Sequence, residues 1–170
     1  SHDGGAKTLV IEKSNQYGGT SATSGGGVWI PNNRYAKAEN VDDSDQDARD
    51  YINSVSPEGM IKDELIETYI SEGPKMIDYL HENSQVKYRN LSHYPDYFPD
   101  NPGGKEGNRS MEPEPINGTI LGTDLGKLRE QHPQTAFTMG TINMNFTQVE
   151  GQLLLGALPG WKTLFAKLFT

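Results

Sequence analysis

The sequence predicts an α/β fold, with an α+β arrangement among the 170 residues given. Three observations support it. Residues 8–11 form a continuous apolar run, which is typical of a strand buried on both faces of a parallel sheet. A glycine-dense segment follows at residues 18–27, and apolar residues then recur at helical spacing. This order places the start of the sequence inside a βαβ unit, just before its second strand.

The first expected strand, residues 8–11, ends at Glu12 and Lys13. The segment at residues 18–27 contains too many glycines for an ordinary helix or strand. We therefore expect its backbone to lie very close to another group. The apolar residues Val28, Trp29 and Ile30 follow it at once.

Three helices are expected within residues 41–84. The first has an apolar face at i, i+3, i+4 and i+7, with Ser44 or Asp43 as its N-cap. The second begins at Ser56, which is followed by proline, and ends at Gly73–Pro74. A short third helix then completes a helical layer after the glycine-dense segment.

A loop rich in aromatic residues is expected at residues 92–104. Its three prolines and two glycines exclude regular structure. Aromatic loops tend to line a pocket or to pack down as a lid. The other expected elements are a strand starting near Val86, a strand near 110–116, a helix at 124–131 capped by Thr123, extended backbone at 134–150 and a helix at 161–168.

Composition excludes several classes of function. The formal net charge of −8 disfavours binding to nucleic acid or to an anionic membrane. No cysteine is present, so disulfides, thiolate nucleophiles and cysteine-ligated zinc are excluded, and the four scattered histidines predict no metal site. No apolar run is long enough to cross a bilayer. We expect a soluble, cytoplasmic protein, and the sequence predicts no oligomeric state.

Two features carry chemistry. Glu12 stands at the carboxyl end of the first expected strand, where an acidic residue can accept hydrogen bonds from ribose hydroxyls. The alternative is a solvated charge. The glycine-dense segment offers backbone amides and small hydroxyls that can bind a pyrophosphate. The alternative, a flexible linker, is disfavoured by the apolar residues on both sides.

The same residues resemble a known family. Residues 10–13 and 17–33, with their GGxSxxSGGG core, are similar to the FAD-binding region of 3-ketosteroid Δ1-dehydrogenases, in the fumarate reductase and succinate dehydrogenase group of flavoproteins. Residues 94–104, 109–113 and 158–161 resemble further motifs of the ketosteroid branch. The resemblance spans nearly the whole chain.

The resemblance implies a partial Rossmann-like FAD-binding domain at residues 1–40, a helical insert at 41–84, and an aromatic loop with the start of a substrate-binding region at 85–170. The first strand and its GxGxxG motif are then expected before residue 1, and further catalytic tyrosines beyond residue 170. The chain alone is accordingly expected to be inactive. The intact enzyme would be cytoplasmic or membrane-associated.

FAD is the cofactor that the resemblance implies. Glu12 and Lys13 would hold the adenosine ribose end. The pyrophosphate and ribityl chain would lie along four residues, and the isoalloxazine ring along four more. In chain order these are Gly18, Gly19, Thr20 and Ser21, then Ser24, Gly25, Gly26 and Gly27.

The resemblance also implies desaturation of the A-ring of a 3-ketosteroid. A hydride passes from C1 to N5 of FAD, a tyrosine takes a proton from C2, and the C3 carbonyl is polarised by another tyrosine and a backbone amide. Tyr94 and Tyr97 are the candidate catalytic tyrosines, and the sequence does not distinguish between them. Alternatively, both pack as hydrophobic anchors. Phe98 and Trp29 are expected to be walls of the site.

The partners implied are a steroid and an electron acceptor of unspecified kind. One alternative is a Δ4-(5α)-ketosteroid dehydrogenase. Another is a fumarate-reductase-like enzyme, which is disfavoured because the aromatic loop has few arginines and histidines to bind two carboxylates. A third is an inactive fragment that binds no cofactor.

Overall fold

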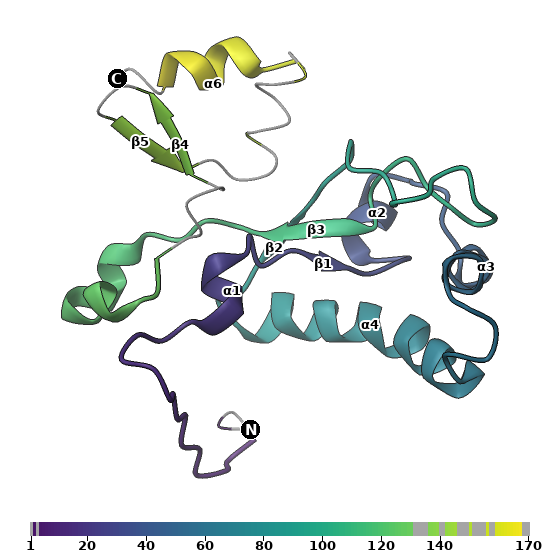
Figure 1. Cartoon of the computed structure of the whole chain (residues 1–170), viewed down its shortest axis with the longest axis horizontal. Helices are drawn as coiled ribbons and strands as arrows, with labels where there is room; N and C mark the ends of the chain where they lie inside the picture. Colours follow the sequence, from purple (N-terminus) through teal and green to yellow (C-terminus); the bar gives the residue numbers. More distant parts are fainter. Residues whose placement is uncertain are drawn as a thin grey trace.

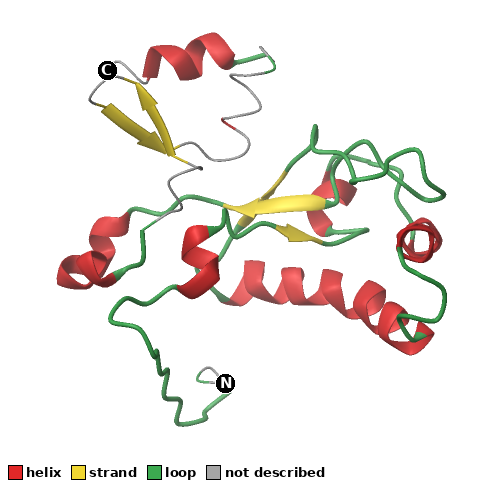
Figure 2. Cartoon of the chain, in the orientation of Figure 1, coloured by secondary structure: helices red, strands yellow, loops and turns green. Residues whose placement is uncertain are grey.

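The computed structural model describes residues 2, 4–130, 136–139, 142–145, 150, 156 and 159–167. It contains helices and strands in mixed order, as the sequence predicts (Figure 1; Figure 2). The helices are α1 (Gly19–Thr23), α2 (Arg34–Ala38), α3 (Asp45–Val55), α4 (Asp63–Asn83), the 3₁₀ helix η1 (Gly118–Lys127) and α6 (Trp161–Lys167). The strands are β1 (Val28–Trp29), β2 (Tyr88–Asn90), β3 (Ser110–Pro113), β4 (Ala136–Met139) and β5 (Ile142–Asn145).

A three-stranded antiparallel sheet forms the centre of the described structure, in the order β1-β3-β2. Met111 of β3 pairs with Val28 on one side and with Asn90 on the other. The long helix α4 runs along one side of this sheet (Figure 1). Ile30, Ile77 and Met111 are buried together between helix and sheet, so this apolar contact fixes α4 beneath the sheet.

Helices α3 and α4 pack against each other through a second apolar cluster. Ala48 of α3 and Ile66 and Ile70 of α4 are buried there, with Ile52 against them. The apolar face expected for the first helix is confirmed at Ala48, Tyr51 and Ile52, whereas its last member, Val55, is 41 % exposed. The expected loop at residues 92–104 and the strands at β2 and β3 are also confirmed.

The N-cap of α3 yields a testable prediction. The Ser44 hydroxyl accepts a hydrogen bond from the backbone N–H of Asp47, 3.1 Å away, and donates one to the Asp47 carboxylate. Ser44→Ala is expected to lower the free energy of unfolding by about 1 kcal/mol, because an N–H of the first turn loses its acceptor. Chemical denaturation of the two proteins measures this. An unchanged midpoint would show that water replaces the cap without cost.

The expected strand at residues 8–11 is wrong. These residues form no strand, and Leu9, Val10 and Ile11 are 84–87 % exposed. Among residues 2 and 4–130, no strand lies beside them to complete a ladder. An apolar run forms a strand only where neighbouring backbone accepts its hydrogen bonds, and here that neighbour is missing.

The expected division of residues 56–83 into two helices is also wrong. Residues 56–62 form a loop, and α4 begins at Asp63 and continues through Pro74 to Asn83. Proline removes one helical hydrogen bond. Ile70 and Gly73 before it and Ile77 after it are all buried, so packing on both sides of Pro74 holds the helix continuous.

Two other expectations differ from the structure. The glycine-dense segment contains the single-turn helix α1. The helix expected at residues 124–131 is instead η1, which ends at Lys127 because the next residues run beside Tyr17. The backbone N–H of Tyr17 donates a hydrogen bond to the carbonyl of Lys127. The carbonyl of Tyr17 accepts a hydrogen bond from the backbone N–H of Arg129, with 2.8 Å between nitrogen and oxygen. Within residues 134–150, β4 and β5 are extended as expected, and the other positions except residue 150 lie outside the described residues.

The expected C-terminal helix is present as α6, and residue 168 lies outside the described residues. The boundaries at 1–40, 41–84 and 85–170 stay a prediction. Both α3 and α4 fall within 41–84, and Ile77 of α4 shares its core with β1 and β3. The helical layer is therefore packed directly on the sheet.

Candidate functional site

An open pocket of about 270 Å³ lies between the glycine-dense segment and the aromatic loop. Its walls come from the end of that segment, from β1, from β3 and from residues 91–97. The lining residues are Ser24, Gly25, Gly27, Val28, Trp29, Leu91, Tyr94, Tyr97, Ser110 and Met111. Segments about 70 residues apart in the sequence thus share one pocket.

The pocket brings together five residues predicted from the sequence. Ser24, Gly25 and Gly27 form one wall, and Tyr94 and Tyr97 lie on the aromatic loop. The expected wall residue Trp29 also lines the pocket. Tyr94 is half-buried, whereas Tyr97 is 84 % exposed, so the two residues differ in their exposure to solvent.

Gly26 lies between the pocket glycines and has a φ of +67°, in the region that favours glycine. A Cβ at this position would come within 3.2 Å of the Pro113 side chain. The segment therefore crosses β3 at close range with no side chain between. This agrees with the expectation that its backbone lies very close to another group.

The other predicted cofactor residues do not line this pocket. Gly18 is the N-cap residue of α1, and Gly19, Thr20 and Ser21 are its first three residues. Glu12 and Lys13 lie in the exposed N-terminal segment, which runs away from the sheet (Figure 1). The Glu12 carboxylate accepts a hydrogen bond from the backbone N–H of Ser14. Their predicted roles stay predictions.

The aromatic loop is held by Asp96, a buried carboxylate between the two pocket tyrosines. One oxygen of Asp96 accepts a hydrogen bond from the indole N–H of Trp29 at 2.6 Å. Its other oxygen accepts from the Arg109 guanidinium at 2.8 Å and from the backbone N–H of Lys105 at 3.0 Å. Both oxygens of Asp96 are therefore satisfied, and each ties the loop to a different part of the chain.

Arg109 is the centre of this network. It is 1 % exposed and makes a bidentate ion pair with Asp43 in addition to its bond with Asp96. Its guanidinium also lies over the rings of Trp29 and Tyr51, 5.4 and 5.7 Å from their centroids. Burial opposes its charge, but the hydrogen bonds and charges of the two aspartates outweigh burial and raise the pKa of Arg109. We call Trp29, Asp43, Asp96 and Arg109 the Arg109 network.

Sequence reasoning missed this network. The sequence indicates Asp43 only as a helix N-cap, and Asp96 and Arg109 only as members of motifs that resemble those of the ketosteroid branch. Their partners are 13 and 66 residues apart along the chain, so neither helical nor strand periodicity links them. The available signal was an acidic residue inside an aromatic loop, because a carboxylate among aromatic side chains requires a paired cation.

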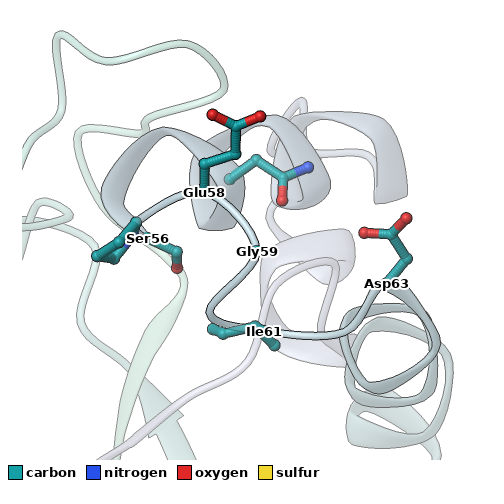
Figure 3. A pocket seen from close by; sticks show the side chains of 7 residues that line it. Ser56, Glu58, Gly59, Ile61 and Asp63 are labelled. Carbon is teal, nitrogen blue, oxygen red and sulfur yellow. The ribbon is translucent and has the colours of Figure 1, made fainter.

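A second pocket, of about 290 Å³, lies in the loop between α3 and α4 (Figure 3). Ser56, Gly59 and Ile61 line it, with Asn53 and Pro57 beside them. The side chains of Glu58 and Asp63 do not converge on one point (Figure 3). Every residue of this pocket is exposed or half-buried, so it lacks the enclosed polar groups of a binding site.

In the part of the chain that the structure describes, no three histidine, aspartate or glutamate side chains come together as a metal site would need. Over the same residues, no helix has both the length and the apolar character needed to cross a bilayer.

Comparison with known proteins identifies the family. Residues 1–160 match the family model described as FAD binding domain. The chain belongs to the FAD binding domain family. FAD, the cofactor predicted from the sequence, is the cofactor of this family. The match includes the glycine-dense segment, α3, α4 and the aromatic loop.

Two relatives and one solved structure resemble this FAD binding domain. The 3-oxosteroid 1-dehydrogenase of Mycolicibacterium smegmatis is 37% identical over 145 residues, which are 85% of this chain and 25% of that protein. The 4-oxocyclohexanecarboxylate 2-dehydrogenase of Sinomonas cyclohexanicum is 35% identical over 135 residues, 79% of this chain and 23% of that protein. The chain thus spans about a quarter of the length of these relatives.

The solved structure is the 3-ketosteroid delta1-dehydrogenase from Sterolibacterium denitrificans in complex with 1,4-androstadiene-3,17-dione. It superimposes with a TM-score of 0.83 at 36% identity and covers 95% of this chain and 28% of its own. The likeness of fold therefore extends over nearly the whole chain.

The pocket residues fit part of an FAD site. Gly25 and Gly27 leave backbone exposed along one wall, while the half-buried Val28 and Trp29 add apolar surface that suits a flat ring. The volume of about 270 Å³ lies just under the usual range for ligand pockets, roughly 300–1,000 Å³. A pocket of this volume encloses only part of a group as large as FAD.

Proposed function

We propose that this chain is part of an FAD-dependent 3-ketosteroid dehydrogenase that introduces a C1–C2 double bond into the steroid A-ring. One observation carries the proposal: the glycine-dense segment and the two predicted tyrosines line the same pocket. A ring held there would lie between exposed backbone and phenol hydroxyls. The steroid bound in the solved relative and the names of the curated relatives support this substrate class.

The chemistry requires a base next to an activated C–H bond. The C2 proton of a 3-ketosteroid becomes acidic only when the C3 carbonyl oxygen is stabilised as negative charge develops on it. When bound, FAD supplies the acceptor for the hydride that leaves C1. We assign the remaining work on this chain to Tyr94 and Tyr97, one of which takes the C2 proton or assists the tyrosine that does.

The cofactor roles of the other predicted residues belong to the same proposal. Ser24, Gly25, Gly26 and Gly27 would lie along the isoalloxazine ring. Gly18, Gly19, Thr20 and Ser21 would lie along the pyrophosphate and ribityl chain. Glu12 and Lys13 would hold the adenosine ribose once the N-terminal segment is paired with neighbouring backbone.

A smaller ring ketone is the second candidate substrate. The Sinomonas relative is named for dehydrogenation of 4-oxocyclohexanecarboxylate, in which the reacting bond again lies next to a ring carbonyl. Both substrate types share a six-membered ring ketone, and they differ in the bulk beyond that ring. Parallel assays of a 3-ketosteroid and of 4-oxocyclohexanecarboxylate with the intact enzyme separate the two.

The proposal predicts that Tyr94→Phe or Tyr97→Phe lowers kcat of the intact enzyme by about 10²- to 10⁴-fold, because a phenol hydroxyl in proton transfer contributes on this scale. The measurement is steady-state desaturation of a 3-ketosteroid, with bound flavin quantified by absorbance. Tyr79→Phe is the control, because Tyr79 is an exposed residue of α4 outside the pocket. Wild-type rates in both pocket variants would contradict the assignment.

A further inference from the structure

Asp96 links the two sides of the proposed active site through one carboxylate. It lies in the aromatic loop between Tyr94 and Tyr97, and it accepts a hydrogen bond from Trp29, which follows the pocket glycines in β1. Trp29 itself lines the pocket. The carboxylate therefore fixes the tyrosine-bearing loop relative to the glycine-bearing wall.

Arg109 connects this link to the rest of the fold. Its guanidinium binds Asp96 on one side and Asp43 on the other. The Asp43 carboxylate in turn accepts hydrogen bonds from the backbone N–H of Asn32 at 2.8 Å and from the backbone N–H of Ser44 at 3.0 Å. The chain after β1, the start of α3 and the aromatic loop thus meet at one buried cation, whose side chain is 2 % exposed.

Stability alone does not account for such a network. Removing two carboxylates and a guanidinium from water costs free energy, and a well-packed apolar cluster of similar volume would hold the loop equally well or better. Buried ion pairs with several fixed partners instead favour one geometry over others, as the bidentate fork of arginine does here. The geometry favoured by the Arg109 network is the approach of the tyrosine loop to the glycine wall.

We propose that Asp96 and Arg109 are positioning residues that hold Tyr94 and Tyr97 at a fixed distance from the glycine wall of the pocket. The inference rests on the proposed function, because it assigns those tyrosines to proton transfer. Asp96 and Arg109 touch no reacting atom. They act through the loop at residues 92–104.

Asp96→Asn is the test variant. Three N–H donors converge on the two oxygens of Asp96, so in either orientation the amide NH₂ group faces an N–H donor. Arg109 keeps its bidentate partner Asp43, which preserves most of the buried pairing. Glu67→Gln is the matched control, because it also replaces a carboxylate that binds an arginine, Arg49, at the α3–α4 contact outside the pocket.

Two measurements on the intact, FAD-loaded enzyme test the inference. The first is amide hydrogen exchange of peptides covering residues 92–104, which is expected to become faster in Asp96→Asn and to stay at the wild-type rate in Glu67→Gln. The second is turnover of a 3-ketosteroid, where kcat is expected to fall by about 10- to 100-fold at unchanged flavin content in Asp96→Asn alone. Asp96→Glu, which restores the carboxylate, is expected to recover part of the lost kcat.

The outcomes separate this inference from the proposed function. If the wild-type enzyme desaturates the steroid and Asp96→Asn matches Glu67→Gln in both measurements, the positioning role is wrong and the function stands. If the wild type is inactive on ring ketones, the proposed function fails, and the exchange of residues 92–104 still decides whether Asp96 fixes the loop. Should Asp96→Asn not fold, Trp29→Phe removes the indole donor and part of the ring while leaving the Arg109–Asp96 pair in place, and unchanged exchange and kcat in that variant would overturn the proposal.

Discussion

Replacing Gly103 with alanine is expected to lower the free energy of unfolding by about 2–5 kcal/mol, far more than the same change at Gly59. Both glycines have nearly the same left-handed conformation, with φ of +73° and +72°. That conformation alone costs an L-residue roughly 1–2 kcal/mol. They differ in their surroundings: a Cβ at 103 would lie 2.0 Å from the Asp47 carbonyl oxygen, whereas a Cβ at 59 meets nothing within 4 Å.

The difference between the two variants isolates the crowding. Overpacking in a site that cannot relax costs roughly 1–3 kcal/mol, and here the neighbour is backbone of α3. Urea denaturation of wild type, Gly59→Ala and Gly103→Ala measures both losses. Equal losses at the two positions would mean that the aromatic loop does not pack on α3 as described.

Arg109→Met is expected to be similarly damaging, with a loss of about 3–5 kcal/mol, because it leaves Asp43 and Asp96 buried without their cation. Methionine fills much of the volume and restores none of the five donors of the guanidinium. Thermal and chemical unfolding followed by circular dichroism provide the measurement.

Arg49→Met is the comparison for this second experiment. Arg49 also donates two guanidinium N–H groups to one carboxylate, that of Glu67, but the side chains of Arg49 and Glu67 are 31% and 50% exposed. Water can solvate the Glu67 carboxylate that remains, so we expect only a minor change in the free energy of unfolding. If Arg49→Met lost as much free energy of unfolding as Arg109→Met, burial of the ion pair would not be the cause of the loss at Arg109.

The sequence predicted much of the candidate site because the signals there are local. Ser24–Gly27 combine glycines and hydroxyls in one short segment, and Tyr94 and Tyr97 lie in a loop that prolines keep irregular. Each of these features depends on residue types that are neighbours in the chain. That they face each other was implied by the resemblance, and the pocket brings them together.

The Arg109 network could not be predicted in the same way. Its members come from four separate loops and strand ends, and a charge in a loop is usually solvated. Only the folded chain shows that Asp96 is buried and that Trp29 and Arg109 supply its donors.

The errors in the fold have a common physical cause. Gly73–Pro74 is a strong local stop signal, yet burial of Ile70 and Ile77 on either side overrides it. Residues 8–11 have strong strand composition, yet strand formation requires backbone partners that the described residues do not provide. In the first case long-range contacts keep the helix continuous against a local stop signal. In the second case the absence of such contacts among the described residues leaves a strand-like segment without a strand.

The close packing of α4 under the sheet makes the shape of the pocket adjustable from outside it. A methyl group on Gly73 would touch Ile30 at 3.3–3.4 Å, and Ile30 directly follows Trp29, a wall of the pocket. A small side chain at position 73 would therefore push the Ile30 side chain by a few tenths of an ångström without replacing any residue that lines the pocket. The packing behind one wall of the pocket can therefore be altered from the far side of the sheet.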